Sequence, residues 1–327
     1  MTNSLGNNSI WRRIAFALAP VAALAGIIGC NNSVADSSGE PAGDGKLQVV
    51  ATTGPVGDMV RNIAGDLGTV DVMMGPGVDP HLYKELPSDM QKIAAADIVF
   101  YNGLHLEGRM AEVLERRGQR HPVYAVTERL EKAKDERLRF PREFDGFADP
   151  HVWHDAALWA DCAEVVGDRL AEIDPENAAT YREATKAYQD KLLELDAYCR
   201  AEIESLPEKH RLLVTAHDAF GYFSKAYGLE SVGMKGISTE DEVSLGRMDE
   251  VVQLIIDRQL PAIFAESSSS DRLIEAVIEP CRQAGHDVKI GEELYADALG
   301  KPEDGADTYE GMMRSNVDAI VRGLGGK

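Results

Sequence analysis

PENAATYREATKAYQDKLLELDAYCRAEIESL, residues 175–206, divides the chain into two halves of similar organisation. Apolar or small side chains recur in it at steps of three and four residues, which is the spacing of one helix face. They are Tyr181, Ala184, Tyr188, Leu192, Leu195, Cys199, Ile203 and Leu206. With Pro175 in its first turn, the pattern predicts one helix of about 48 Å, since each residue adds 1.5 Å. Such a helix can lie along two domains and argues against a flexible hinge of several strands.

On both sides of this helix, short β-branched runs alternate with amphipathic segments. The strand candidates before it are LQVVATTG (47–54), TVDVMMG (69–75), DIVFYNG (97–103) and PVYAV (122–126). Those after it are RLLVTA (211–216), SVGMKG (231–236), AIFAESS (262–268) and DVKIG (287–291), with helices such as 247–259 and 271–284 between them. This alternation is typical of parallel sheets. It predicts an α/β fold of two (β/α) lobes, residues 47–174 and 207–327, joined by the linking helix at 175–206.

The N-terminal segment is predicted to be an export signal and a tether. Arg12 and Arg13 precede the apolar run Ile14–Ile28, which is shorter than the roughly 20 residues that span a bilayer. The run ends in a lipobox-like Ile-Ile-Gly-Cys, so residues 1–29 are expected to be a cleaved signal peptide and Cys30 the lipidated residue. An uncleaved anchor, or an ordinary signal with an incidental cysteine, is the alternative. Residues 30–46 then form a flexible tether that holds the exported protein on a bacterial membrane, facing the periplasm or the cell exterior.

The charge of the chain favours cations as binding partners. Its 327 residues include 34 basic and 55 acidic side chains, a formal net charge of −21. Such a surface repels phosphate backbones and anionic headgroups, so nucleic acid binding and charge-driven membrane binding are excluded. Ordinary glycine and proline contents and four cysteines exclude fibrous, disordered and disulfide-dense classes.

Three cysteines remain if Cys30 carries lipid, and an odd number cannot be fully paired. Cys162, Cys199 and Cys281 each lie on an apolar stripe at helical spacing, without the spacing of a zinc cluster. They are predicted to be buried thiols that pack as small hydrophobic residues, with at most one disulfide among them.

The tripeptide Asp-Pro-His occurs twice in the first half, in VDPHLYKELPSD (78–89) and in ADPHVWHDAALWA (148–160). Proline fixes its own φ and restricts the preceding residue, so each tripeptide places an imidazole, His81 or His151, at a stiff loop corner. One loop histidine alone is more often an ordinary polar residue, but the repeat favours a binding site. His154 is a second ligand if this turn is helical, but a helix start near Asp155 points it elsewhere, so it is expected behind the ligands or at the surface.

The second half contributes two further candidates. His217 directly follows the strand candidate RLLVTA, and ligands of open α/β sheets bind at the carboxyl ends of strands. Its neighbour Asp218 is a competitor for a metal ion or a partner for an imidazole. In GADTYEGMMRSNV (305–317), Asp307 opens the last helix, where an N-cap is the alternative role.

At these residues the sequence resembles the zinc- and manganese-binding solute-binding lipoproteins of bacterial ABC importers. Shared segments cover nearly the whole chain. Beyond the lipobox, the two Asp-Pro-His motifs and the long helix, they are TAHDAFGYF (215–223), GISTEDEVS (236–244), IFAESS (263–268), GEELYADALG (291–300) and DTYEGMMRSN (307–316). The resemblance implies one divalent ion, Mn²⁺ or Zn²⁺, between the lobes, with His81, His151, His217 and Asp307 as ligands. It places Glu266 near the cleft, and it implies an ABC permease and ATPase as partners and no enzymatic activity.

The identity of the ion stays open. Three neutral imidazoles and one carboxylate suit Zn²⁺ and also tolerate Mn²⁺, and the Irving–Williams order favours Zn²⁺ at equal access. Zinc-specialised proteins similar to this family often carry a His-rich insert in the first lobe. The stretch Glu128–Gly146 is charged and contains no histidine, which favours the manganese or broad-metal branch.

Two other functions are alternatives to an extracytoplasmic receptor that delivers a metal ion to a permease. An exported metal-dependent hydrolase needs an open coordination position and a general base, and the sequence has neither HExxH nor GxSxG. A surface adhesin is the other alternative, but neither an aromatic repeat nor a low-complexity stalk supports it.

Overall fold

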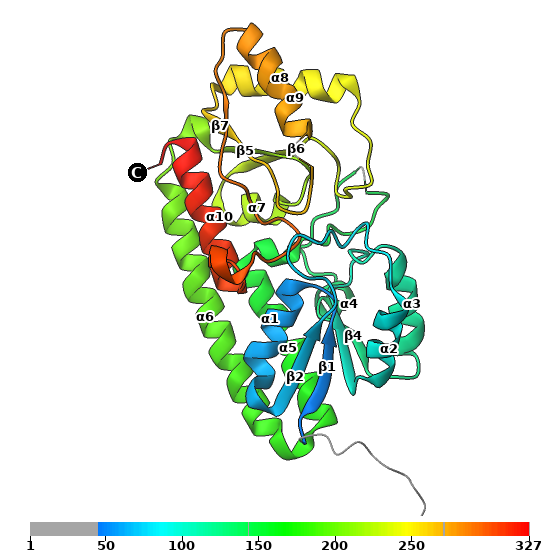
Figure 1. The fold of residues 1–327 in the computed structure, drawn as a ribbon. Helices are drawn as coiled ribbons and strands as arrows, with labels where there is room; N and C mark the ends of the chain where they lie inside the picture. The colour runs from blue at the N-terminus through cyan, green and yellow to red at the C-terminus, as the bar shows by residue number, and fades with distance from the viewer. Residues whose placement is uncertain (1–44, 143, 271, 327) are drawn as a thin grey trace, which may run out of the picture. The chain divides into compact units, whose positions relative to one another are not determined.

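A computed structural model describes residues 45–142, 144–270 and 272–326 of the chain (Figure 1). The predicted signal peptide, Cys30 and most of the predicted tether lie outside the described residues. Within them, no helix is both long enough and apolar enough to cross a membrane. By their contacts, the described residues belong to one compact unit, so the lobe boundaries at residues 174 and 207 stay predictions.

The first lobe is built on a four-stranded parallel sheet with the order β2-β1-β3-β4. Its strands are β1 (Leu47–Ala51), β2 (Gly68–Val72), β3 (Ile98–Tyr101) and β4 (Val123–Ala125). Its helices are α1 (Gly54–Ala64), α2 (Pro87–Ala95), α3 (Arg109–Gly118) and α4 (Glu128–Ala133). Alternate side chains of β1 enter different cores: Val49 and Ala51 pack on one face of the sheet and Val50 on the other. Both faces are covered, which explains the continuous apolar run of this strand.

The second lobe contains two parallel strand pairs. They are β5 (Leu212–Thr215) with β6 (Glu230–Gly233), and β7 (Ala262–Ile263) with β8 (Lys289–Ile290). The backbone N–H of Phe264 donates to the carbonyl of Val214 at 2.9 Å and so joins β7 to β5. Its helices are α7 (Gly221–Tyr227), α8 (Leu245–Arg258), α9 (Arg272–Gln283) and α10 (Tyr309–Leu324). All eight predicted strands are present, which confirms the parallel α/β prediction.

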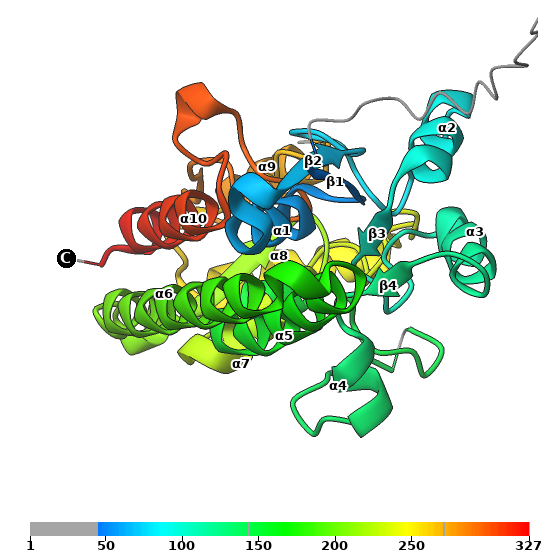
Figure 2. The same cartoon turned by 90° about the horizontal axis from the view of Figure 1, so that it is seen from below.

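The long linking helix is α6 (Ala178–Glu204), with 27 residues and a length of about 40 Å. It is shorter than predicted because Pro175–Asn177 forms a 3₁₀ turn, while the chain leaves the helix ahead of Pro207. Figures 1 and 2 show α6 with α10 beside it, and α5 (Ala156–Ile173) packs along it. One hydrophobic cluster continues from the first sheet through α5 and α6 to the second lobe. This shared core agrees with the expectation that no flexible hinge of several strands separates the lobes.

The three cysteines of the described residues are free and buried. Cys162 lies in α5, Cys199 in α6 and Cys281 in α9, each within a hydrophobic cluster. The prediction of buried thiols is confirmed, and the disulfide that the sequence left open does not form among them.

Candidate metal centre

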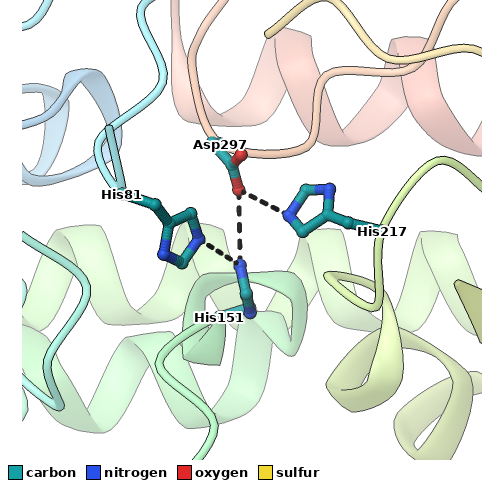
Figure 3. A group of neighbouring side chains, drawn as sticks. All are labelled: His81, His151, His217 and Asp297. Carbon is teal, nitrogen blue, oxygen red and sulfur yellow. Dashed lines mark hydrogen bonds and ion pairs between the residues drawn. The ribbon is translucent and has the colours of Figure 1, made fainter. Parts of the chain in front are cut away.

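Four buried side chains converge between the two lobes: His81, His151, His217 and Asp297 (Figure 3). Each offers one ligand atom, and these four atoms lie within 4.8 Å of one another. The Nε2 atoms of His81 and His151 are 3.2 Å apart. Oδ1 of Asp297 lies 3.4 Å from Nε2 of His151 and 3.3 Å from Nε2 of His217. Two of these residues come from the first lobe and two from the second, so the group bridges both.

The two Asp-Pro-His tripeptides adopt the same local turn. Oδ1 of Asp79 accepts the backbone N–H of His81 at 2.8 Å, and Oδ1 of Asp149 accepts that of His151 at 3.0 Å. An aspartate that bonds the backbone two residues further on forms a short turn that fixes the chain direction. The repeated tripeptide thus aims two imidazoles into the site by one mechanism.

Buried carboxylates orient two of the imidazoles from behind. Nδ1 of His151 donates to Oδ1 of Asp149 at 2.8 Å, and Asp149 also pairs with Arg139. Nδ1 of His217 donates to Oε2 of Glu266 at 2.5 Å, while Oε1 of Glu266 accepts the backbone N–H of His217 at 2.9 Å. With each Nδ1 committed to a carboxylate, each Nε2 is left to face the centre. Metal-binding histidines in proteins are commonly fixed in this way.

Burial and charge act differently on the four groups. Burial lowers the pKa of His81 to about 3, so this imidazole is neutral. Burial also acts to lower the pKa of His217, but the charges of Asp297 and Glu266 outweigh it and raise that pKa well above its usual value. For His151, hydrogen bonds to Asp149 and Asp297 outweigh burial and raise the pKa. For Asp297, burial is outweighed by the charge of His217 and a hydrogen bond from His151, so its pKa lies well below the usual range.

This pattern describes a centre suited to a cation. Nε2 of His217 and Oδ1 of Asp297 are buried, and among the described residues their polar contacts in this group are long: 3.3 Å to each other and, for Oδ1, 3.4 Å to Nε2 of His151. Leaving such groups unsatisfied in a protein interior costs free energy. A divalent ion bound there would satisfy both atoms and displace the imidazole protons.

The spacing of the ligand atoms also fits a transition-metal ion. Tetrahedral coordination with bonds of about 2.0–2.2 Å places neighbouring ligand atoms about 3.3–3.6 Å apart. Three of the six separations among the ligand atoms are 3.2, 3.3 and 3.4 Å, and all six are within 4.8 Å. The ligand atoms are imidazole nitrogens and a carboxylate oxygen, with no sulfur. This donor set suits both Zn²⁺ and Mn²⁺.

The expected fourth ligand, Asp307, is not part of this group. Asp307 is exposed and lies just before α10, where Thr308 rather than Asp307 caps the helix by accepting the N–H of Gly311 at 3.1 Å. A side chain that precedes this helix on the exposed side does not reach the buried centre. Asp297 supplies the carboxylate instead.

The three residues expected near the site occupy distinct places. Glu266 contacts His217 directly, as described above. Asp218 lies 3.5 Å from Arg139, the residue that pairs with Asp149. His154 is fully buried, its pKa is lowered by burial to about 3, and its Nε2 donates to the carbonyl of Ala296 at 2.9 Å. His154 therefore lies behind the group and does not join it.

Sequence reasoning missed Asp297 although its segment, GEELYADALG, was recognised as shared with the resembled family. The signal was its position: it follows β8 as His217 follows β5, and both lie after strands of the second lobe. Because parallel strands present their carboxyl ends at one edge, loops that follow them can meet there.

Comparisons with known proteins agree with this architecture. The family described as zinc-uptake complex component A, periplasmic, matches residues 49–323. The manganese-binding lipoprotein MntA of Bacillus subtilis is 41% identical over 91% of this chain and 95% of its own length. The metal ABC transporter substrate-binding lipoprotein SsaB of Streptococcus sanguinis is 31% identical over 96% of this chain and 99% of its own.

The zinc-binding protein TroA of Treponema pallidum is similar in both sequence and structure. In sequence it is 43% identical over 88% of this chain and 92% of its own length. Its solved structure superposes with a TM-score of 0.78 and 41% identity, covering 86% of this chain and 99% of that one. The match of the family over most of the chain, together with these relatives, shows that the chain belongs to the family of periplasmic component A proteins of zinc-uptake complexes.

Proposed function

We propose that this protein is an extracytoplasmic receptor that binds one divalent transition-metal ion through His81, His151, His217 and Asp297. It then delivers the ion to an ABC permease for import. The relatives named as manganese-binding, zinc-binding and metal ABC transporter substrate-binding proteins support this proposal.

One observation carries the proposal: three imidazole nitrogens and one carboxylate oxygen lie close together in a buried group. Each lobe contributes two of the four residues. An ion held there is bonded to the first lobe through two histidines and to the second through His217 and Asp297. Binding of the ion is therefore coupled to the relative position of the two lobes. A membrane partner can recognise that position as a signal.

The same geometry weighs against a metal-dependent hydrolase. Four protein ligands complete a tetrahedral coordination sphere, whereas catalytic metal sites keep one position open for water or substrate. The buried acidic residues beside the group, Asp149 and Glu266, are engaged by imidazole Nδ1 atoms. Neither is placed to act as a general base, and no relative named above is described as an enzyme or an adhesin.

Manganese is the proposed physiological ion, although Zn²⁺ should bind more tightly in vitro. Imidazole-rich sites favour Zn²⁺ by the Irving–Williams order, but delivery also requires release. Residues 128–146 contain no histidine, and the absence of a His-rich insert favours manganese. In the structure this stretch includes α4 and Arg139, which pairs with Asp149 behind His151.

We propose that the receptor is lipid-anchored through Cys30 and partners with the permease and ATPase of a metal importer. Replacing Cys30 by serine should abolish lipid labelling and release an exported protein with its metal site intact, because the tether separates the anchor from the fold. Unchanged membrane retention would indicate an uncleaved signal anchor.

The test of the function combines binding with cellular metal content. The purified domain should bind one Zn²⁺ or Mn²⁺ ion per chain, and a gene-deletion strain should lose cell-associated manganese before zinc. Normal manganese with depleted zinc would replace the manganese assignment by a zinc receptor. A domain that binds neither ion would overturn the proposal.

A further inference from the structure

Two aromatic N–H groups from the turn after His151 meet on one carbonyl oxygen of the second lobe. Nε1 of Trp153 donates to the carbonyl of Ala296 at 3.0 Å, and Nε2 of His154 donates to the same oxygen at 2.9 Å. Both donors are almost wholly buried, with 1% and 0% of their surface exposed. Ala296 directly precedes Asp297, the only carboxylate of the four-residue group.

We propose that Trp153 and His154 form a clamp that positions Asp297 for the metal ion by fixing the Ala296 carbonyl. The clamp is the pair of donors together with the acceptor oxygen. The proposal rests on the proposed metal-binding function and adds two positioning residues to it.

The clamp fixes the carboxylate through its own backbone. A carbonyl oxygen has two lone pairs, and both are engaged by N–H donors here, so the peptide between Ala296 and Asp297 cannot rotate without breaking both bonds. Further along the side chain, the hydroxyl of Ser268 donates to Oδ2 of Asp297 at 3.2 Å. Oδ1 is thereby directed at His151 and His217.

The donors are themselves held by the second lobe. The hydroxyl of Tyr309, at the start of α10, donates to the carbonyl of Trp153 at 2.6 Å. The His154 ring packs on the Phe220 ring with centroids 4.5 Å apart. A turn that belongs to the first half of the sequence is thus embedded in the second lobe.

The clamp also couples two ligands. The Trp153 ring lies edge-on to the His151 ring, with centroids 5.2 Å apart, while its Nε1 holds Ala296. One short turn, Val152–His154, therefore contacts a ligand of the first lobe and sets the position of a ligand of the second. Its donors act on metal affinity without touching the ion.

The test is the dissociation constant of Zn²⁺, measured by chelator competition. Trp153→Phe and His154→Leu each remove one donor and should weaken binding about 10-fold, the lower end for groups that orient metal ligands. His154→Gln keeps an N–H donor and should restore most of the affinity. Together, Trp153→Phe and His154→Leu should cost more than the product of the single effects, because only the pair leaves the carbonyl without a donor.

Two matched controls separate positioning from packing. Trp159→Phe makes the same change at a buried tryptophan of α5, and His286→Leu removes a histidine whose Nε2 lies 2.8 Å from the carbonyl of Leu260, away from the site. Both should lower the melting temperature of the metal-free protein without changing the Zn²⁺ dissociation constant. In an Asp297→Ala background, the clamp substitutions should have no further effect on affinity.

The clamp is overturned if Trp153→Phe and His154→Leu bind Zn²⁺ like the wild type, or if they weaken binding equally in the Asp297→Ala background. If His154→Leu does not fold, Trp153→Phe alone decides the question by the same two criteria. Failure of the wild type to bind Zn²⁺ would instead refute the proposed function, so the two failures are distinguishable.

Discussion

The two sides of the metal centre are held in different ways. On one side, Asp149 fixes His151 and Glu266 fixes His217, while the held carbonyl of Ala296 fixes the backbone of Asp297. At most 1% of the surface of these three ligands is exposed. On the other side, His81 is 7% exposed and sits on the loop between β2 and α2, which also carries the exposed Leu82 and Leu86.

A hydrogen bond from Thr239 links this loop to the second lobe. The hydroxyl of Thr239 donates to Oδ2 of Asp79 at 2.6 Å, and Oδ1 of Asp79 holds the backbone of His81. The difference indicates a site with three preorganised ligands and one that adjusts. We therefore expect the ion to be bound mainly by the fixed side and released first on the His81 side.

The largest effect should come from the fixed side. Asp297→Ala removes the only carboxylate and leaves a cation among neutral or protonated imidazoles, so Zn²⁺ affinity should fall by more than about 100-fold, beyond the range of outer-shell substitutions. Asp307→Ala is the matched control and should change nothing, since Asp307 is exposed. Isothermal titration of both variants checks this, and a larger loss for Asp307→Ala would restore it as the ligand.

His81→Ala should cost less, about 10- to 100-fold, because three fixed ligands remain and water can take the fourth position. The loss should appear mainly as faster dissociation, since the variant leaves the fixed side intact. Stopped-flow transfer of the ion to a chelator measures this rate. A loss as large as that of Asp297→Ala, with an unchanged dissociation rate, would remove the difference between the two sides.

Acidification should weaken binding through the fixed side. The pKa values of His151 and His217 are raised above the usual value in the metal-free protein, so in mild acid both imidazoles carry protons that the ion must displace. Affinity should therefore fall by about tenfold per pH unit for each displaced proton, while the already neutral His81 contributes nothing near neutral pH. Titrations between mild acid and neutral pH test this. A flat profile would show that these histidines do not bind the ion.

The smallest effect is expected from the hydrogen bond between Thr239 and Asp79, which holds the His81 loop. Thr239→Val removes the hydroxyl but keeps the shape of the side chain, and one hydrogen bond contributes about 0.5–1.5 kcal/mol. The metal dissociation rate should rise by a few-fold, on the order of 2- to 10-fold, and Thr239→Ser should restore it. If valine and serine behave alike, the Thr239–Asp79 contact does not hold the loop.

The sequence predicted the fold closely because periodicity carries that information. The eight strands and the linking helix follow from apolar runs and from steps of three and four residues, which depend on local geometry alone. The ends of the linking helix were predicted wrongly, because Pro175 is compatible with both an α-helical first turn and the 3₁₀ turn that forms.

The candidate site was predicted only where a motif has a local consequence. His81 and His151 share a tripeptide whose turn is set by its own aspartate, and His217 follows a well-marked strand. Asp297 has only a weak mark, its place after β8, and lies seven residues beyond that strand; its position depends on the Ala296 carbonyl and therefore on Trp153 and His154, more than 140 residues earlier. Contacts of that range are not visible in a local pattern, and the carboxylate before the last helix was chosen instead.

Anomalous diffraction from crystals of the mature domain loaded with Zn²⁺, recorded at the zinc edge, shows directly which residues bind the ion. We expect one peak per chain, about 2.0–2.2 Å from Nε2 of His81, His151 and His217 and from the carboxylate of Asp297. A peak elsewhere, or one whose carboxylate ligand is Asp307, would contradict this expectation.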